Sequence, residues 1–126
     1  MKVAKFVELI GRSTGVTIDA EVAMADWTPS VPGRLKKVMV LTGGIAATTL
    51  IENGYIKLQS STFGGVDMYA PFDGGGLFTA PRQKGNWACQ VTECDLKIEA
   101  KPIKLYYYHN VAPTTPEITV FAEIEA

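Results

Sequence analysis

Apolar and polar residues alternate in several short runs of this sequence. In the run from Cys94 to Ala100, apolar side chains stand at every second position, separated by Asp95, Lys97 and Glu99. Because successive side chains of a strand point to opposite faces, a period of two predicts strands that bury one face. Similar runs occupy residues 16–24, 35–41, 66–70, 103–108 and 118–124, with glycine and proline between them. Eight to ten short strands at this spacing predict an all-β fold, a sandwich or a barrel, and we favour an antiparallel β-sandwich.

The N-terminal residues 1–14 depart from this alternation. Four apolar side chains recur there at helical spacing: Val3, Phe6, Val7 and Ile10. Gly11 follows them in the position of a C-terminal helix cap. The pattern favours a short amphipathic helix, too short to be stable alone, that docks on its own sheet or on a neighbouring subunit. The alternative is an N-terminal strand.

A turn signal stands near the middle of the chain. Asn53-Gly54 is the preferred pair for a two-residue hairpin, since both positions need a positive φ. In that register Ile51 faces Ile56 and the apolar side chains share one face. The alternative is a helix over 45–52 that ends at Asn53-Gly54. We favour the hairpin, because β-branched residues are frequent in this stretch.

No linker, repeat or low-complexity tract divides the 126 residues, so we expect one domain over residues 1–126. Hydrophobic residues make up 47% of the chain, and this surplus in a small domain hints at a buried interface between subunits. Pro71 is expected to end the strand that begins at Val66.

Charge and hydropathy narrow the function classes. The net charge is −1, and the densest basic cluster holds only Arg34, Lys36 and Lys37, which disfavours direct nucleic-acid binding. No apolar stretch reaches the roughly 18–20 residues that cross a bilayer, so we expect no transmembrane segment. Glu8 interrupts the N-terminal apolar run, so we expect no signal peptide.

Neither the histidine nor the cysteines predict catalysis, a metal or another cofactor. His109 is the only histidine, and the chain has no G-x-S-x-G turn, so we interpret His109 as a polar residue at a strand end. Cys89 and Cys94 would point to opposite faces of a straight strand. A structural thiol is favoured over a disulfide, which would need a bulge or a turn between them, and over metal binding.

Two further patterns have ordinary structural interpretations. The carboxylate pairs Asp19/Glu21 and Glu123/Glu125 each share one strand face, as a solvated face would show. The run Asp73 to Gly76 contains three glycines but is not followed by the long helix of a phosphate-binding loop. We expect a flexible turn there, and we expect the protein not to be an enzyme.

Aromatic residues are the remaining lead. Tyr106 and Tyr108 alternate with Leu105 and Tyr107, so they are expected on the outer face beside Lys104. Exposed tyrosines of this kind serve protein interfaces or sugar stacking. The candidate interface or ligand-platform residues are Trp27, Trp87, Tyr106, Tyr108 and Phe6.

The strand rhythm over residues 16–125 resembles that of the single jelly-roll proteins of virus particles. Three features carry the resemblance: the short strands, the Gly/Pro-rich stretch 71–85, and the closing runs 103–108 and 117–124 around a proline-bracketed loop. The resemblance implies a jelly-roll topology. It also implies a non-enzymatic capsid, vertex or decoration subunit of the virion, a homo-oligomer that also contacts other coat proteins. Outside a virion the expected location is the cytoplasm.

A departure from many coat proteins concerns the N-terminus. Lys2 and Lys5 are its only basic residues, whereas coats that package nucleic acid often carry a basic arm. A role in the shell, away from the genome, fits better. The alternative function is that of a carbohydrate-binding β-sandwich module, which would use the exposed aromatic residues as stacking platforms.

Overall fold

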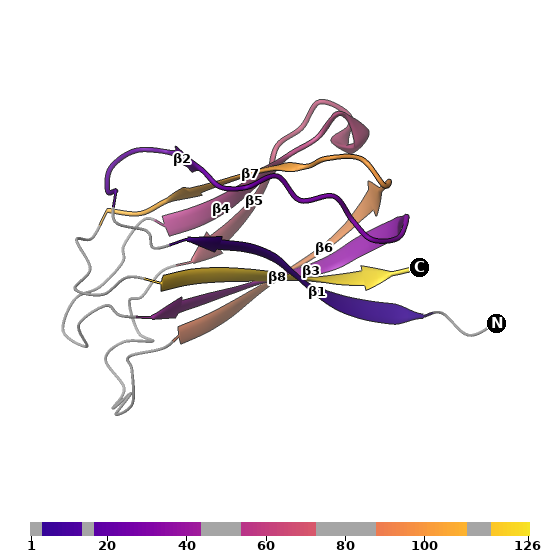
Figure 1. Ribbon diagram of the computed structural model, residues 1–126, viewed down its shortest axis with the longest axis horizontal. Helices are drawn as coiled ribbons and strands as arrows, with labels where there is room; N and C mark the ends of the chain where they lie inside the picture. Colours follow the sequence, from indigo (N-terminus) through magenta and orange to yellow (C-terminus); the bar gives the residue numbers. More distant parts are fainter. Residues whose placement is uncertain (1–3, 14–16, 44–53, 73–87, 111–116) are drawn as a thin grey trace.

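The computed structural model describes residues 4–13, 17–43, 54–72, 88–110 and 117–126. Over these residues the chain forms two antiparallel four-stranded sheets that lie as two layers, as Figure 1 shows. Among the described residues the only helical element is one 3-10 turn, Ser61–Phe63. The expected all-β sandwich is therefore confirmed.

The two sheets differ in strand length. The long sheet has the order β1-β8-β3-β6, and its strands are β1 (Lys5–Ser13), β8 (Glu117–Glu125), β3 (Gly33–Gly43) and β6 (Ala88–Ile98). The short sheet has the order β2-β7-β4-β5, and its strands are β2 (Val22–Ala23), β7 (Lys104–Tyr108), β4 (Gly54–Gln59) and β5 (Met68–Phe72).

The strands pair in a nested order. β1 pairs with β8, β2 with β7, β3 with β6 and β4 with β5. One long antiparallel hairpin with its tip between β4 and β5 produces this order when it rolls up into two layers. The pairs β3–β8 and β4–β7 close the roll. This connectivity is that of a jelly roll, so the favoured topology is confirmed as well.

The core lies between the two sheets and is built from the inward positions of the alternating runs. On β8 these are Ile118, Val120, Ala122 and Ile124, all buried. The short sheet contributes buried side chains from β4 and β7: Ile56, Leu58, Leu105 and Tyr107. On β3 the spacing changes from Leu35 to Val38, because the ladder has a bulge between Leu35 and Lys37.

The described part of the N-terminal segment forms the strand β1, so the predicted helix is wrong and the alternative strand is observed. β1 pairs with β8 along its whole length, with a register shift between Leu9 and Gly11. The bulge adds one residue, the buried Ile10. The helical spacing arises because the outward Val7 is apolar, whereas Glu8, which pairs with the buried Ala122, points inward although it is charged. Gly11 is therefore not a helix cap.

The predicted hairpin at Asn53-Gly54 is wrong in its pairing. Ile56 of β4 pairs with Ala70 of β5 on one side and with Tyr107 of β7 on the other. Both edges of β4 are occupied, which leaves no place for Ile51 beside it. Residues 45–53 themselves lie outside the described residues.

Two expected strands have different limits. Pro71 does not end its strand, because β5 continues to Phe72 as the edge of the short sheet, where a missing N–H is tolerated. Val66, expected at the start of this strand, lies before it and is exposed. The run 16–24 forms only the short β2, since the backbone turns at Asp19, where φ is 57°.

Candidate interaction surfaces

The outer face of the long sheet carries a continuous row of apolar side chains. Leu9 of β1 pairs with Phe121 of β8, Phe121 with Met39 of β3, and Met39 with Val91 of β6. Directly paired residues point to the same face, so the row crosses all four strands. Leu9 and Val91 are 55% and 53% exposed, and the two central residues are half-buried. These four residues are called the apolar row below.

A charged row lies beside the apolar row on the same face. Glu123 of β8 pairs with Lys37 of β3, and Lys37 pairs with Glu93 of β6. The Nζ of Lys37 lies 3.9 Å from Oε2 of Glu123. These side chains line a shallow depression together with Lys5 and Glu125. The outer face of the long sheet therefore has the apolar row and, beside it, a row that is charged on β8, β3 and β6 and has the exposed Val7 at its β1 end.

A second ion cluster stands at the bulge of β3. The guanidinium Nε of Arg34 donates to the carboxylate of Asp95, and Nζ of Lys36 lies 3.3 Å from the same oxygen. The hydrogen bond from Arg34 is the main reason that the pKa of Asp95 is lowered, and Lys36 adds to it. All three side chains are at least partly exposed. Two of the three basic residues that the sequence groups together, Arg34 and Lys36, thus bind a carboxylate of this same chain.

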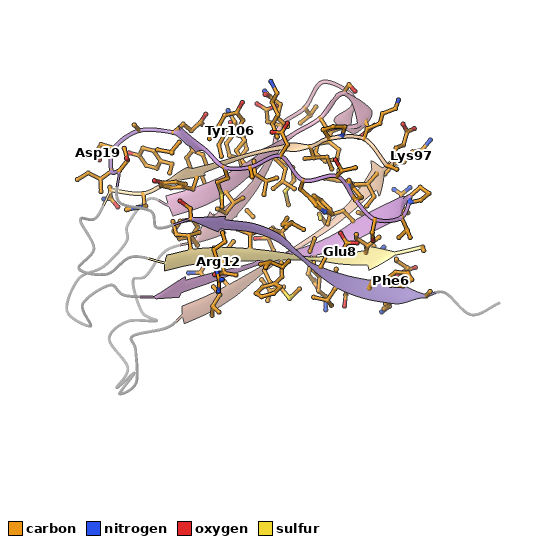
Figure 2. The ribbon with its side chains drawn as sticks, in the orientation of Figure 1. Phe6, Glu8, Arg12, Asp19, Lys97 and Tyr106 are labelled. Atoms are coloured by element: carbon orange, nitrogen blue, oxygen red, sulfur yellow. The ribbon has the colours of Figure 1, made fainter. Side chains whose placement is uncertain are left out.

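The outer face of the short sheet carries four tyrosines, called the tyrosine face: Tyr55, Tyr69, Tyr106 and Tyr108. Tyr106 and Tyr108 lie outward between the buried Leu105 and Tyr107, as the alternation predicts. In Figure 2 Tyr106 stands on the side of the short sheet that faces away from the long sheet, whereas Arg12 projects from β1 on the opposite side of the molecule. Sequence reasoning missed Tyr55 and Tyr69 at this face.

Glu21 links two residues of the tyrosine face. Its Oε2 accepts a hydrogen bond from the Tyr55 hydroxyl at 2.6 Å, and its Oε1 accepts one from Nζ of Lys57 at 2.7 Å. These bonds, that of Lys57 foremost, lower the pKa of Glu21. The bond to Glu21 raises the pKa of Tyr55 to about 12 and also raises the pKa of Lys57. At neutral pH the cluster therefore holds one carboxylate, one ammonium and one neutral phenol.

The tyrosine rings pack against one another and against Lys57. The rings of Tyr55 and Tyr108 stack with centroids 5.2 Å apart and an interplanar angle of 13°. Tyr69 meets Tyr55 edge-on at 5.1 Å, and Nζ of Lys57 lies 4.7 Å from the centroid of the Tyr106 ring. A sugar platform needs a free ring face, so this packing offers hydroxyls and ring edges more than flat apolar surfaces.

The two tryptophans and Phe6 differ in what the structure shows of them. Trp27 is only 6% exposed, and its indole N–H bonds to Glu8, so its ring packs beneath the surface and is not an exposed platform. Phe6 lies on β1 opposite Ile124 and is 41% exposed. Trp87 and the run from Asp73 to Gly76 lie outside the described residues.

His109, interpreted from the sequence as a polar residue at a strand end, directly follows β7 and is buried, with 1% of its surface exposed. Its ring stacks on that of Tyr107 at 5.7 Å with an interplanar angle of 18°, and its carbonyl accepts a hydrogen bond from the N–H of Asp19 at 2.8 Å. The signal was present, because position 109 continues the inward alternation of Leu105 and Tyr107.

Cys94 is a free thiol, as favoured, and is half-buried on β6. Its Sγ–H donates to the carbonyl oxygen of Leu35 at 3.4 Å, and burial raises the pKa of the thiol to about 11. The side chain of Cys89 lies outside the described residues. Cys94 is thus held as a neutral structural group.

The carboxylate pairs do not form a reactive dyad in the described structure. Glu21 is bound to Lys57 and Tyr55, whereas Asp19 stands where the backbone turns. Glu123 and Glu125 share the outer face of β8, and Glu123 lies near Lys37. The solvated-face interpretation therefore agrees with the positions of Glu123 and Glu125.

Comparison with protein-family models and with curated proteins finds no match to this chain. Among the described residues, no three or more histidine, cysteine, aspartate or glutamate side chains gather as metal ligands would. The described part of the chain also has no helix long and apolar enough to cross a bilayer.

Proposed function

We propose that this protein is a non-enzymatic structural subunit that assembles with itself through the outer face of the long sheet. The observation that carries the proposal is the apolar row, which runs without interruption across all four strands. In a β-sandwich the outer faces are usually polar, because alternation sends apolar side chains to the core. An unbroken outward row of Leu9, Phe121, Met39 and Val91 needs a partner surface.

The energetics favour burial of this row. Fully burying a leucine, valine or phenylalanine side chain contributes roughly 1.5–3 kcal/mol. Leu9 and Val91 are a little more than half exposed, so covering each of them contributes about 1 kcal/mol or more. Phe121 and Met39 add the unburied part of larger side chains. Burial of these four side chains stabilises association if the charged row also meets opposite charges on the partner surface.

The particular form that we propose is a capsid, vertex or decoration subunit of a virus particle. Jelly rolls occur in viral capsid, lectin and cupin domains, so the topology fits this role without selecting it. The low net charge and the lack of a basic stripe suit a subunit that contacts other coat proteins rather than the genome. Under this proposal the protein is located in the virion, and the alternative location is the cytoplasm.

Carbohydrate binding is the second candidate function. The observation that favours it is the gathering of four tyrosines on one outer face, with Glu21 and Lys57 able to bind sugar hydroxyls. It ranks lower because Tyr55 and Tyr108 stack on each other and Tyr106 is covered by Lys57. Titration with oligosaccharides, followed by tyrosine and tryptophan fluorescence, separates the two functions, since an assembly subunit is indifferent to sugars.

The proposal is tested by placing a charge in the apolar row. Leu9→Lys puts an ammonium into the apolar row at the β1 edge of the proposed contact, and we expect the dissociation constant of the assembly to rise tenfold or more. The matched control is Val66→Lys, which makes the same kind of change at a residue that is 68% exposed and lies outside both sheets. If both variants associate as the wild type does, the long sheet's outer face is not the assembly surface.

A further inference from the structure

We propose that the surface that covers the outer face of the long sheet is a second copy of this chain, related by a two-fold axis parallel to the strands and centred between β8 and β3. This inference rests on the proposed self-association and adds its symmetry and register. It follows from the way charge is distributed over the two central strands of the sheet.

Charge is segregated between these two strands at one end of the face. The outward residues of β8 there are acidic, Glu123 and Glu125, and the residues opposite them on β3 are basic, Lys37 and Arg34. The face thus changes sign across the line between β8 and β3. Beyond this region the same two strands carry Phe121 and Met39, which are apolar and also directly paired.

A two-fold axis along this line exchanges the two strands between the copies. Each outward residue of β8 then lies over its own ladder partner on β3 of the second copy. Phe121 faces Met39 of the second copy, and Glu123 faces Lys37 of the second copy. Because a two-fold interface repeats every contact, each of these pairs forms twice.

Both central contacts are favourable in kind. A thioether beside an aromatic ring is an attractive pair, and opposite charges across an interface set the register and speed the encounter. The edge strands follow the same operation, since β1 comes to lie over β6 of the second copy. Leu9 then faces Val91 of the second copy, so that every member of the apolar row meets an apolar residue.

The other symmetric arrangement is less favourable. A two-fold axis along the apolar row, across the strands, places each strand over its own copy. Glu123 would then face Thr119 of the second copy, and Lys37 would face Leu41 of the second copy. In that arrangement the pair Glu123 and Lys37 would be covered by Thr119 and Leu41 and would gain no opposite charge from the second copy, whereas the axis parallel to the strands supplies one to each, so that axis is preferred.

The size of the face suits a dimer. Four strands about 4.8 Å apart and about 3.3 Å per residue along strands of nine residues give a face of about 19 Å by 30 Å. Stable interfaces bury about 800 Å² of accessible surface per partner. The flat area of this face is of the same order, and its projecting side chains add accessible surface to it. Packed sheets cross at about 30°, so the register holds best near the axis, where Phe121, Met39, Glu123 and Lys37 stand.

The test uses two charge reversals, Lys37→Glu and Glu123→Lys, first alone and then mixed. Alone, each variant places like charges at both contacts between residues 123 and 37 of the two copies. We expect the dissociation constant of the dimer to rise roughly tenfold or more. In an equimolar mixture both contacts of the mixed dimer are again opposite in charge, and we expect the affinity to return to that of the wild type. Within each variant chain, residues 37 and 123 carry the same charge whether or not the variants are mixed. A contact within one chain therefore cannot cause the recovery.

A matched control uses an ion pair outside the long sheet. Glu99 and Lys101 lie 3.1 Å apart between β6 and β7, and both are exposed. Lys101→Glu and Glu99→Lys should each dimerise as the wild type does, alone or mixed. Mixed dimers are counted by native mass spectrometry, with one variant labelled with heavy nitrogen, and thermal unfolding shows whether each variant is folded.

A second measurement needs no substitution. Carbodiimide joins a carboxylate to an amine only at contact, so in a mixture of heavy and light wild-type protein it should join Glu123 of one copy to Lys37 of another. Mixed-isotope peptides support the proposal. If every cross-linked peptide carries a single isotope, the two-fold axis is overturned but self-association is not. The same holds if the charge-reversal variants do not recover on mixing while Leu9→Lys is monomeric. A wild-type monomer at all concentrations overturns both.

Discussion

Trp27 donates its indole N–H to the carboxylate of Glu8, with 2.9 Å between Nε1 and Oε2. The other oxygen of Glu8 accepts from the backbone N–H of Ser30 at 3.2 Å and from the Ser30 hydroxyl. One carboxylate on β1 thus holds the segment that enters β3. It points into the space between the layers in Figure 2. This hydrogen bond explains why a glutamate stands at an inward strand position.

Replacing Glu8 should destabilise the fold. Glu8→Ala leaves the N–H of the buried Trp27 without its acceptor, and we expect a loss of about 1–3 kcal/mol in the free energy of unfolding. Glu8→Gln keeps an acceptor oxygen and should lose less than half as much. Chemical unfolding followed by circular dichroism, at one fixed protein concentration, measures both. Glu99→Ala, which removes an exposed ion pair, is the control and should change little.

Two glycines should respond differently to alanine. A Cβ at Gly33 would lie 2.5 Å from the carbonyl oxygen of Glu125, which is backbone and cannot move without shifting β8. We expect Gly33→Ala to cost about 1–3 kcal/mol. At Gly11 a Cβ would meet the end of the Met24 side chain at 3.0 Å, which can rotate away. Gly11→Ala should therefore cost less, and equal losses in thermal unfolding would contradict this difference.

The tyrosine face should show one phenol that titrates late. Tyr55 has its pKa raised to about 12 from the ordinary 10.0, chiefly by its hydrogen bond to Glu21. A raised pKa in the folded state stabilises the protein below pH 10 and loses that contribution as the pH rises towards 12. Glu21→Gln should lower the pKa of Tyr55 and reduce this loss. Ultraviolet difference absorbance follows the phenolates, and an unchanged titration in Glu21→Gln would show that Glu21 is not the cause.

The thiol of Cys94 should react slowly. Burial raises its pKa to about 11, so little thiolate is present near neutral pH. In a Cys89→Ser background, alkylation of Cys94 should be many-fold slower in the folded protein than in denaturant at the same pH. Rapid alkylation of the folded protein, at the rate of a free thiol, would mean that Cys94 is not held against Leu35.

The alternation of apolar residues was sufficient to predict the strands that bury one face. The inward residues of β7 and β8 follow it without exception. It failed on β1, because the outward Val7 is apolar and the inward Glu8 is charged, which leaves the apolar residues at a helical spacing. The turn signal at Asn53-Gly54 also gave a wrong partner for Ile56, which pairs with Ala70 of the following strand and with Tyr107 of the distant β7.

The two outer surfaces could be predicted only in part. The alternation places Tyr106 and Tyr108 outward, but their contact with Tyr55 and Lys57 depends on which strands lie side by side. The apolar row depends on the same long-range register, since Leu9 and Phe121 are far apart in the sequence. No local pattern carries that information.

Self-association of the long sheet is the central claim, and the mass of the wild-type protein in solution tests it most directly. Sedimentation equilibrium over a range of concentrations should give a mass that rises above the 13.6 kDa of one chain to at least twice that value in the micromolar range. A mass that stays at one chain up to millimolar concentration would contradict self-association through the apolar row.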